Sequence, residues 1–296
     1  MEMIKLKHEI RDPLHGFIKI SSDERDILDS LPLQRLRDIY QLGLTYLLYP
    51  SATHKRFEHS LGVMELATKV FDVVTSSENI HLGIEKSLPE IRDDEKKRYW
   101  RKVLRIAALC HDVGHLPFSH AGEKELLPYG WGHEGMTIEI IKRELASLFD
   151  ELTPPVRVKD VIKLAIGPRK LLEIDPNIEF SMWETILSEI IVGDAFGVDR
   201  MDYLLRDSHH IGVAYGKLPL GVIMLSPNYM FYVLYKMRSE DVLRPIIFKP
   251  FEPNAQIIRS EILDWTKEYT NKAIAHYSLV ALSVWIILTA ILLLIQ

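Results

Sequence analysis

The sequence predicts a mostly α-helical protein with a small amount of strand and a hydrophobic helix at its C-terminus. In residues 57–74 apolar side chains recur every three or four positions, which is the spacing of one buried helix face. Helical spacing returns around residues 134–149 and 189–209. Apolar residues make up 47% and charged residues 26% of a 296-residue chain, the balance of a folded protein that can bury a core.

The remaining elements of the N-terminal part follow from shorter patterns. Residues 17–20 predict a short strand, and a polar stretch from residue 76 to about 97 is expected to connect two helices. The second of these helices should run from there through WRKVLRIAALCHD and stop at Gly114. Pro117 and Gly122 then predict an irregular connection.

Three segments of different character are expected along the chain. Residues 1–216 form the helical core, and residues 217–275 form a segment of mixed structure with a strand-like run, NYMFYVLYKM, at residues 228–237. Residues 277–295 carry no charged side chain, and a helix of that length can cross a bilayer. The alternative is a buried terminal helix, but an apolar face would suffice for that, whereas this segment is apolar all round.

Charge, cysteine content and the N-terminal residues indicate the cellular compartment and the classes of partner to expect. The net charge of −5 gives no general attraction to nucleic acid, so no stable double-stranded nucleic-acid partner is expected. Cys110 is the only cysteine, which excludes an internal disulfide framework and fits a reducing cytoplasm. The N-terminal MEMIKLKHEI lacks the apolar run of a secretory signal. We therefore expect a cytoplasmic catalytic domain, with the C-terminal segment as a candidate membrane anchor.

Histidine and carboxylate residues form a pattern much denser than a chance His-Asp pair. It comprises His59, HDVGHLPFSH at residues 111–120, HE at residues 133–134 and DRMDYLLRD at residues 199–207. Imidazole and carboxylate together suit Zn, Mn, Fe or a related divalent ion and need no thiolate. Neighbouring His and Asp side chains can reach one ion only where a helix end turns them together, and the following glycine and proline favour such a turn.

Other polar residues near this pattern offer the rest of a phosphate-cleaving site. Arg56 lies one turn before His59 and is a candidate phosphate clamp, because guanidinium binds phosphate in a forked geometry. His133, with Glu123 nearby in sequence, offers an acid–base group and an orienting carboxylate. Gln34, Arg35 and Arg37 are interpreted instead as a solvent-exposed helix face.

These motifs resemble those of the HD-domain deoxynucleoside triphosphate triphosphohydrolases, in the branch that includes the vertebrate enzyme carrying a SAM domain. The matching segments are RDPLHGFIKI, LPLQRLRDIYQLG, RFEHSLGV, CHDVGHLPFSH, WGHEG and DRMDYLLRDSHHIGV. They occur in order from about Arg11 to Gly216, roughly seventy per cent of the chain. The resemblance implies an HD-type helical bundle, and after Gly216 the chain departs from the family pattern.

The resemblance also implies a role for each matching residue. One divalent ion, which could be Mn, Fe, Zn, Mg, Co or Ni, would be held by His59, His111, Asp112 and Asp199. His115 would contact the phosphate next to the nucleoside, and His120 would help to position the attacking water. His133 would act as general acid, oriented by Glu123, where some family members have aspartate.

For the substrate, the resemblance implies a nucleoside triphosphate cleaved to a nucleoside and inorganic triphosphate. Arg56 would bind the phosphates, and the sugar pocket would be formed by Gln41, Leu42, Tyr203 and Asp207. Leu42 would lie close enough to C2′ to disfavour a ribose hydroxyl, so a dNTP is expected. A homo-oligomer is also in keeping with the family. The alternatives are hydrolysis of another phosphoester (a nucleoside monophosphate, a cyclic nucleotide or single-stranded nucleic acid) and a membrane-held nucleotide sensor with little turnover.

Overall fold

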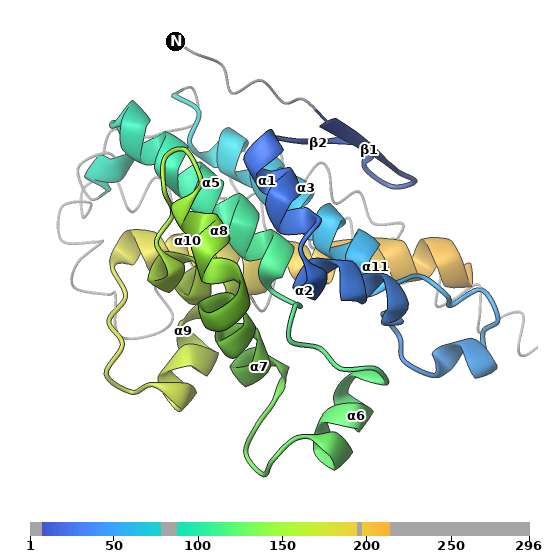
Figure 1. The fold of residues 1–296 in the computed structure, drawn as a ribbon. Coiled ribbons are helices and arrows are strands. Elements are labelled where there is room, and N and C mark those ends of the chain that lie inside the picture. The colour runs from blue at the N-terminus through green and yellow to red at the C-terminus, as the bar shows by residue number, and fades with distance from the viewer. Residues whose placement is uncertain (1–7, 78–87, 194–196, 214–296) are drawn as a thin grey trace, which may run out of the picture. The chain divides into compact units, whose positions relative to one another are not determined.

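The computed structural model describes residues 8–77, 88–193 and 197–213, and this part of the chain is mostly helical (Figure 1). It begins with an antiparallel hairpin of β1 (His8–Asp12) and β2 (Gly16–Ile20). Gly16 has a φ of 78°, which closes the turn at little steric cost. The strand predicted at residues 17–20 is confirmed. Its partner β1 was not predicted, because HEIRD has a single apolar residue and no strand signature.

Short helices connect the hairpin to the central helices. The Ser21 side chain accepts a hydrogen bond from the Glu24 N–H, and the Glu24 carboxylate accepts one from the Ser21 N–H, so both residues cap the first helix. The connecting elements are α1 (Ser22–Leu28), α2 (Leu31–Gln34), η1 (Arg35–Asp38) and η2 (Thr45–Leu47).

Three long helices pack together and supply most of the site. Helix α3 (Arg56–Val74) contacts both α5 (Asp94–Cys110) and α11 (Val198–Ile211). Helix α5 also contacts α9 (Val158–Ile174), which packs on α10 (Met182–Val192). The apolar face predicted for α3 is buried, as the pattern required. These helices bury most of the described hydrophobic core, so the polar residues among them are held rigidly.

The structure corrects two predicted elements and refines a third. The helix expected through WRKVLRIAALCHD begins earlier, at Asp94, and ends at Cys110, before a turn that reaches Gly114. The connection expected around Pro117 and Gly122 is wrong in part, because residues Ser119–Leu126 form a helix, α6. The helical segment expected around residues 189–209 is interrupted. Helix α10 ends before Gly193, and α11 begins only at Val198.

The segment predicted at residues 134–149 is helical and contains an irregular turn. It consists of α7 (His133–Ile140), a π-helical turn labelled η4 (Ile141–Leu145) and α8 (Ala146–Asp150). A 3-10 turn, η3 (Pro89–Ile91), precedes α5. Helix α7 has His133 at its first position, where the His133 ring stacks on that of His115.

The expectations for residues 217–275 and 277–295 lie outside the described residues. In the part of the chain that the structure describes, no helix is long and apolar enough to cross a membrane. The strand-like run at residues 228–237 and the C-terminal hydrophobic helix therefore stay predictions.

Candidate metal centre and acid–base group

Three of the four predicted metal ligands come together from three different parts of the bundle. His59 lies on α3, His111 follows the end of α5, and Asp199 lies in the first turn of α11. One ligand atom from each lies within 4.8 Å of those of the other two. The Asp199 Oδ1 is 3.1 Å from the His59 Nε2 and 3.6 Å from the His111 Nε2. This is a donor set that suits a divalent ion.

The fourth predicted ligand, Asp112, borders this group. Its Oδ1 is 3.5 Å from the His111 Nε2, and its Oδ2 is 3.7 Å from the His59 Nε2. Asp112 Oδ2 also accepts a hydrogen bond from the Arg56 guanidinium. Because His111 and Asp112 lie in the turn after α5, their neighbouring side chains reach the same space, which a continuing helix would not allow.

The hydrogen bonds of His111 provide a test of whether these residues fit a metal. Its Nδ1 lies 2.8 Å from the Ala108 carbonyl oxygen, to which only an N–H can donate. The Nε2 is buried and has no hydrogen-bond partner among the residues that the structure describes, where carboxylates are its neighbouring charged groups. A buried lone pair that faces carboxylates is unfavourable unless a cation or a proton lies between them. His111 is therefore held in the form that a metal ligand requires.

Electrostatics in the metal-free protein agree with a site for positive charge. Burial favours a neutral His59, but hydrogen bonds and charges from Asp199 and Asp202 outweigh it and raise the pKa of His59 to about 10. Burial likewise opposes the charge of Asp112, yet the Arg56 guanidinium holds the pKa of Asp112 well below its usual range. A proton on His59 thus occupies the place that a metal would take.

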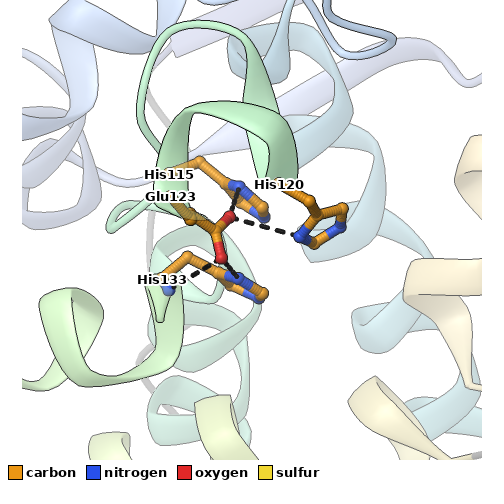
Figure 2. A group of neighbouring side chains, drawn as sticks. All are labelled: His115, His120, Glu123 and His133. Atoms are coloured by element: carbon orange, nitrogen blue, oxygen red, sulfur yellow. Dashed lines mark hydrogen bonds and ion pairs between the residues drawn. The ribbon is translucent and has the colours of Figure 1, made fainter. Parts of the chain in front are cut away.

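A second polar group lies beside the metal centre, with the Glu123 carboxylate in the middle of three histidines (Figure 2). Its Oε1 is 3.2 Å from the Nδ1 of His115 and 3.2 Å from the Nδ1 of His120. Its Oε2 is 3.1 Å from the His133 Nδ1. These residues come from the turn after α5, from α6 and from the start of α7.

The ring orientations in this second group favour proton handling over metal binding. The His115 and His133 rings stack with centroids 3.9 Å apart and planes only 13° apart. A metal ion lies in the plane of each imidazole that binds it, and two nearly parallel, stacked rings cannot share such a plane. Burial disfavours charge on His115, but Asp112 and Glu123 raise its pKa. Burial and the charge of His115 lower the pKa of His133. The two rings therefore differ in their affinity for a proton.

Arg56 joins the two groups. Its side chain is buried, one Nη pairs with Asp112, and the other donates to the Ser119 Oγ on α6 at 2.8 Å. The Gln41 carbonyl oxygen lies 3.5 Å from the same Arg56 Nη2, so the segment that carries Gln41 and Leu42 borders this side of the site. The Arg56 guanidinium thus lies between the metal centre and α6.

The other two residues predicted for the sugar pocket lie further along α11. Tyr203 is one turn after Asp199 and is half-buried. Asp207 is buried, and its Oδ1 bonds to the His54 Nε2 at 2.8 Å. His54 also stacks on His210, with ring centroids 4.6 Å apart. In this structure one oxygen of the Asp207 carboxylate is therefore hydrogen-bonded to His54.

The structure also shows polar residues that the sequence pattern did not single out. Asp202 accepts a hydrogen bond from the His59 Nδ1 at 2.8 Å. It lies three residues after Asp199 on α11, a spacing that places two residues on one helix face and could have indicated it. The solvent-exposed interpretation of Arg35 is wrong, because its guanidinium donates to the carbonyl oxygens of Val113 and His115. Arg37 is exposed as expected.

Fold and site together define a helical metal-binding domain built on a His-Asp pair. The family model described as HD domain matches residues 56–205, half of the 296-residue chain, and the chain belongs to this family. HD domains bind divalent metal ions, and the matched range contains the four predicted ligands.

Individual relatives agree with this assignment. The chain is 39% identical to an uncharacterized protein of Methanocaldococcus jannaschii over 73% of this chain and 37% of that protein. It is 33% identical to the human deoxynucleoside triphosphate triphosphohydrolase SAMHD1 over 69% of this chain and 33% of that protein. A crystal structure of a hypothetical protein from Aquifex aeolicus aligns with a TM-score of 0.54 and 34% identity, covering 74% of this chain and 50% of that one. The chain thus spans about a third of the length of the two curated relatives.

Proposed function

We propose that this protein is a metal-dependent phosphohydrolase that cleaves dNTPs to a deoxynucleoside and inorganic triphosphate. The observation that carries the proposal is the adjacency of two groups. The metal centre, with its unpartnered His111 Nε2, adjoins the Glu123–histidine group, and the His115 Nε2 lies 3.4 Å from Asp112. The family and a relative named as a deoxynucleoside triphosphate triphosphohydrolase support the same reaction class.

In this proposal His59, His111, Asp112 and Asp199 hold the divalent ion. When bound, such an ion supplies Lewis-acid polarisation of a phosphoryl oxygen and makes a neighbouring water more acidic. Arg56 binds the phosphates, for which it must exchange part of its pairing with Asp112. Its charge then opposes the repulsion between the buried carboxylates and the triphosphate.

The Glu123 group handles the protons. Glu123 accepts from the His133 Nδ1–H and so directs the opposite ring nitrogen away from itself, toward a leaving oxygen. Burial and the charge of His115 lower the pKa of His133, so once this ring has taken up a second proton from solvent, on the nitrogen opposite Nδ1, it releases that proton readily to the departing 5′ oxygen. His115 contacts the phosphate next to the nucleoside. His120, whose side chain is 69% exposed, positions the attacking water at the solvent side.

Selection of the deoxyribose is assigned to Gln41, Leu42, Tyr203 and Asp207. Leu42 is half-buried beside the segment that contacts Arg56 and disfavours a 2′-hydroxyl sterically. Asp207 contacts a sugar hydroxyl through the carboxylate oxygen that is not bonded to His54. The competing functions are hydrolysis of another phosphoester and nucleotide sensing with little turnover.

The test is an assay of the purified full chain with each dNTP and rNTP, a nucleoside monophosphate and a cyclic nucleotide, each with Mn²⁺, separating the nucleoside and phosphate products by chromatography. Asp112→Ala is expected to abolish both products. Asp72→Ala is the matched control, because it removes an exposed carboxylate on α3 that pairs with Arg101 outside the site. Triphosphate from dNTPs in wild type and control supports the proposal. Cleavage of a monophosphate or cyclic nucleotide instead, or Mn²⁺ binding without turnover, would contradict it.

We also propose that residues 277–295 anchor the catalytic domain at the cytoplasmic face of a membrane. The support is the uncharged length of this segment. Cells that express the full chain are compared with cells that express a chain ending at Lys272. Recovery of both forms in the soluble fraction to the same extent would rule out the anchor.

A further inference from the structure

The carboxylate of Asp202 is fully buried behind the metal centre and has four charged or polar contacts. Its Oδ2 accepts from the His59 Nδ1 and from the Arg206 Nε, each at 2.8 Å. Its Oδ1 lies 2.6 Å from the His15 Nε2 and accepts from the Arg206 Nη2 at 2.9 Å. Asp202, Arg206 and His59 are each 0% exposed. Every lone-pair direction of this carboxylate is thus in use.

One face of α11 carries both a predicted metal ligand and this carboxylate. Asp199, Asp202 and Arg206 are separated by three and four residues, so they lie along one stripe that faces α3. Gly62 on α3 is opposite the stripe, and a Cβ on it would lie 1.9 Å from the Asp202 Oδ1 and 2.5 Å from the Arg206 Nη2. Only glycine at this position leaves room for the carboxylate beside α3.

The contact fixes the chemical form of His59. An ionised carboxylate only accepts hydrogen bonds, so the His59 Nδ1 must carry the hydrogen. In the neutral ring the Nε2 then carries the lone pair, and this atom faces Asp199 and Asp112. The orientation and the tautomer of His59 are therefore both those of a metal ligand.

The N-terminal hairpin holds the other side of the carboxylate. His15 lies in the turn between β1 and β2, and the Arg206 Nη1 donates to the Asp12 Oδ2 at 2.9 Å. Asp12 Oδ1 accepts from the backbone N–H groups of Leu14 and His15, each at 2.9 Å. Direct hydrogen bonds between protein groups thus link the hairpin turn to His59 through Asp202.

We propose that Asp202 is a positioning residue of the metal centre, which holds the His59 ring as the Nδ1–H tautomer and is itself fixed by Arg206 and by His15 of the hairpin turn. The inference rests on the metal centre proposed above. It does not depend on which phosphoester is cleaved.

The test is Mn²⁺ affinity of the full chain, measured by calorimetry, for wild type and Asp202→Asn. The asparagine keeps the shape but presents an N–H₂ to one of its neighbours, and His59 loses the acceptor that selects its tautomer. The expected loss of Mn²⁺ affinity is about 10- to 100-fold. In the Zn²⁺-bound protein, which is diamagnetic, NMR should show a strongly hydrogen-bonded, downfield His59 Nδ1–H signal in wild type and a weakened, upfield-shifted signal in the variant.

Glu24→Gln is the matched control for a general loss of stability. Glu24 is also a buried carboxylate that pairs with an arginine, Arg105, but it has no contact with the metal centre. The Glu24→Gln variant should have a lower melting temperature but unchanged Mn²⁺ affinity and an unchanged His59 Nδ1–H signal. If the control loses as much Mn²⁺ affinity as Asp202→Asn, the role of Asp202 is merely structural and the inference is wrong.

His15→Ala keeps the proposal testable if Asp202→Asn does not fold. It removes one support of Asp202 from a turn and leaves His59 and Arg206 in place, so a smaller loss of affinity, at least about threefold, is expected. Unchanged affinity in every folded variant overturns the inference. A wild-type chain that binds no Mn²⁺ overturns the metal centre as well, whereas Mn²⁺ binding without dNTP cleavage contradicts only the proposed substrate.

Discussion

Arg35→Met should loosen the turn that carries the His-Asp pair, although Arg35 has no contact with the metal ligands' side chains. Arg35 lies on η1, and its Nη1 donates to the His115 carbonyl oxygen at 2.9 Å. Its Nη2 donates to the carbonyl oxygen of Val113. Both acceptors lie in the turn after α5, and both residues are buried. One guanidinium therefore ties down a segment with no regular helix hydrogen bonds of its own.

The size of the effect follows from the two hydrogen bonds. A hydrogen bond from a charged group contributes about 1.5–3 kcal/mol, but these two share one cation, and methionine replaces part of the packed stem. We expect a loss of about 2–4 kcal/mol in the free energy of unfolding. If the displaced turn weakens the free energy of Mn²⁺ binding by about 1.4 kcal/mol, Mn²⁺ affinity falls about tenfold.

The assay is urea unfolding together with calorimetric Mn²⁺ titration, with Arg37→Met as the matched control. Arg37 is only two residues away but is exposed, and its guanidinium lies 3.5 Å from the centre of the Phe57 ring. An exposed contact of this kind contributes about 0.5–1 kcal/mol, and it does not touch the turn. If both variants have the same stability and the same Mn²⁺ affinity, the turn is not held by Arg35 and the reasoning is refuted.

Further predictions concern packing, protons and the thiol. Gly114→Ala would place a Cβ 2.1 Å from the His133 carbonyl oxygen and 2.4 Å from the Thr137 nitrogen. It should destabilise the protein by about 1–3 kcal/mol or more and lower kcat more than Mn²⁺ affinity, because α7 carries His133; equal losses would contradict this. In the metal-free protein the pKa of His59 is raised to about 10, so below that pH a proton competes with the metal. Mn²⁺ affinity should rise with pH across the neutral range, by about tenfold per unit for one displaced proton, and calorimetry in buffers of different ionisation enthalpy should detect its release. Burial raises the pKa of the Cys110 thiol to about 12, so a thiol reagent at mildly alkaline pH should label it in urea but not in the folded protein.

The helices that could be predicted are those whose packing shows as a simple period. Helix α3 has one apolar stripe, and its bounds follow from the sequence within a residue. The region around residues 189–209 misled the prediction, because apolar residues continue at helical spacing on both sides of a break. Gly193 and Gly197 were the available signals. Their ψ angles, 133° at Gly193 and 137° at Gly197, lie outside the helical region, so the helix is broken at both positions.

Some residues of the site could be predicted from local sequence motifs, and others are identified only by contacts between distant parts of the chain. The sequence motifs named His59, His111 and Asp199 as ligands, and the structure brings them within reach of one ion. The sequence could not assign a role to His15 or Arg35, because their partners lie 187 and 80 residues away in the chain. Neither a turn nor a helix as short as η1 has a periodic pattern that shows which way its side chains face. For such residues only the tertiary contacts identify the role.

The two halves of the site differ in what holds them. The predicted metal ligands lie on or directly after long helices of the bundle, whereas Glu123 and His120 lie on the short α6, which projects from those helices (Figure 1). Exchanging residues on α6 disturbs little of the buried core, because only Gly122 and Glu123 of this helix are buried. During evolution one short helix can therefore diverge and change the chemistry, while the metal centre and the fold that carries it are inherited intact.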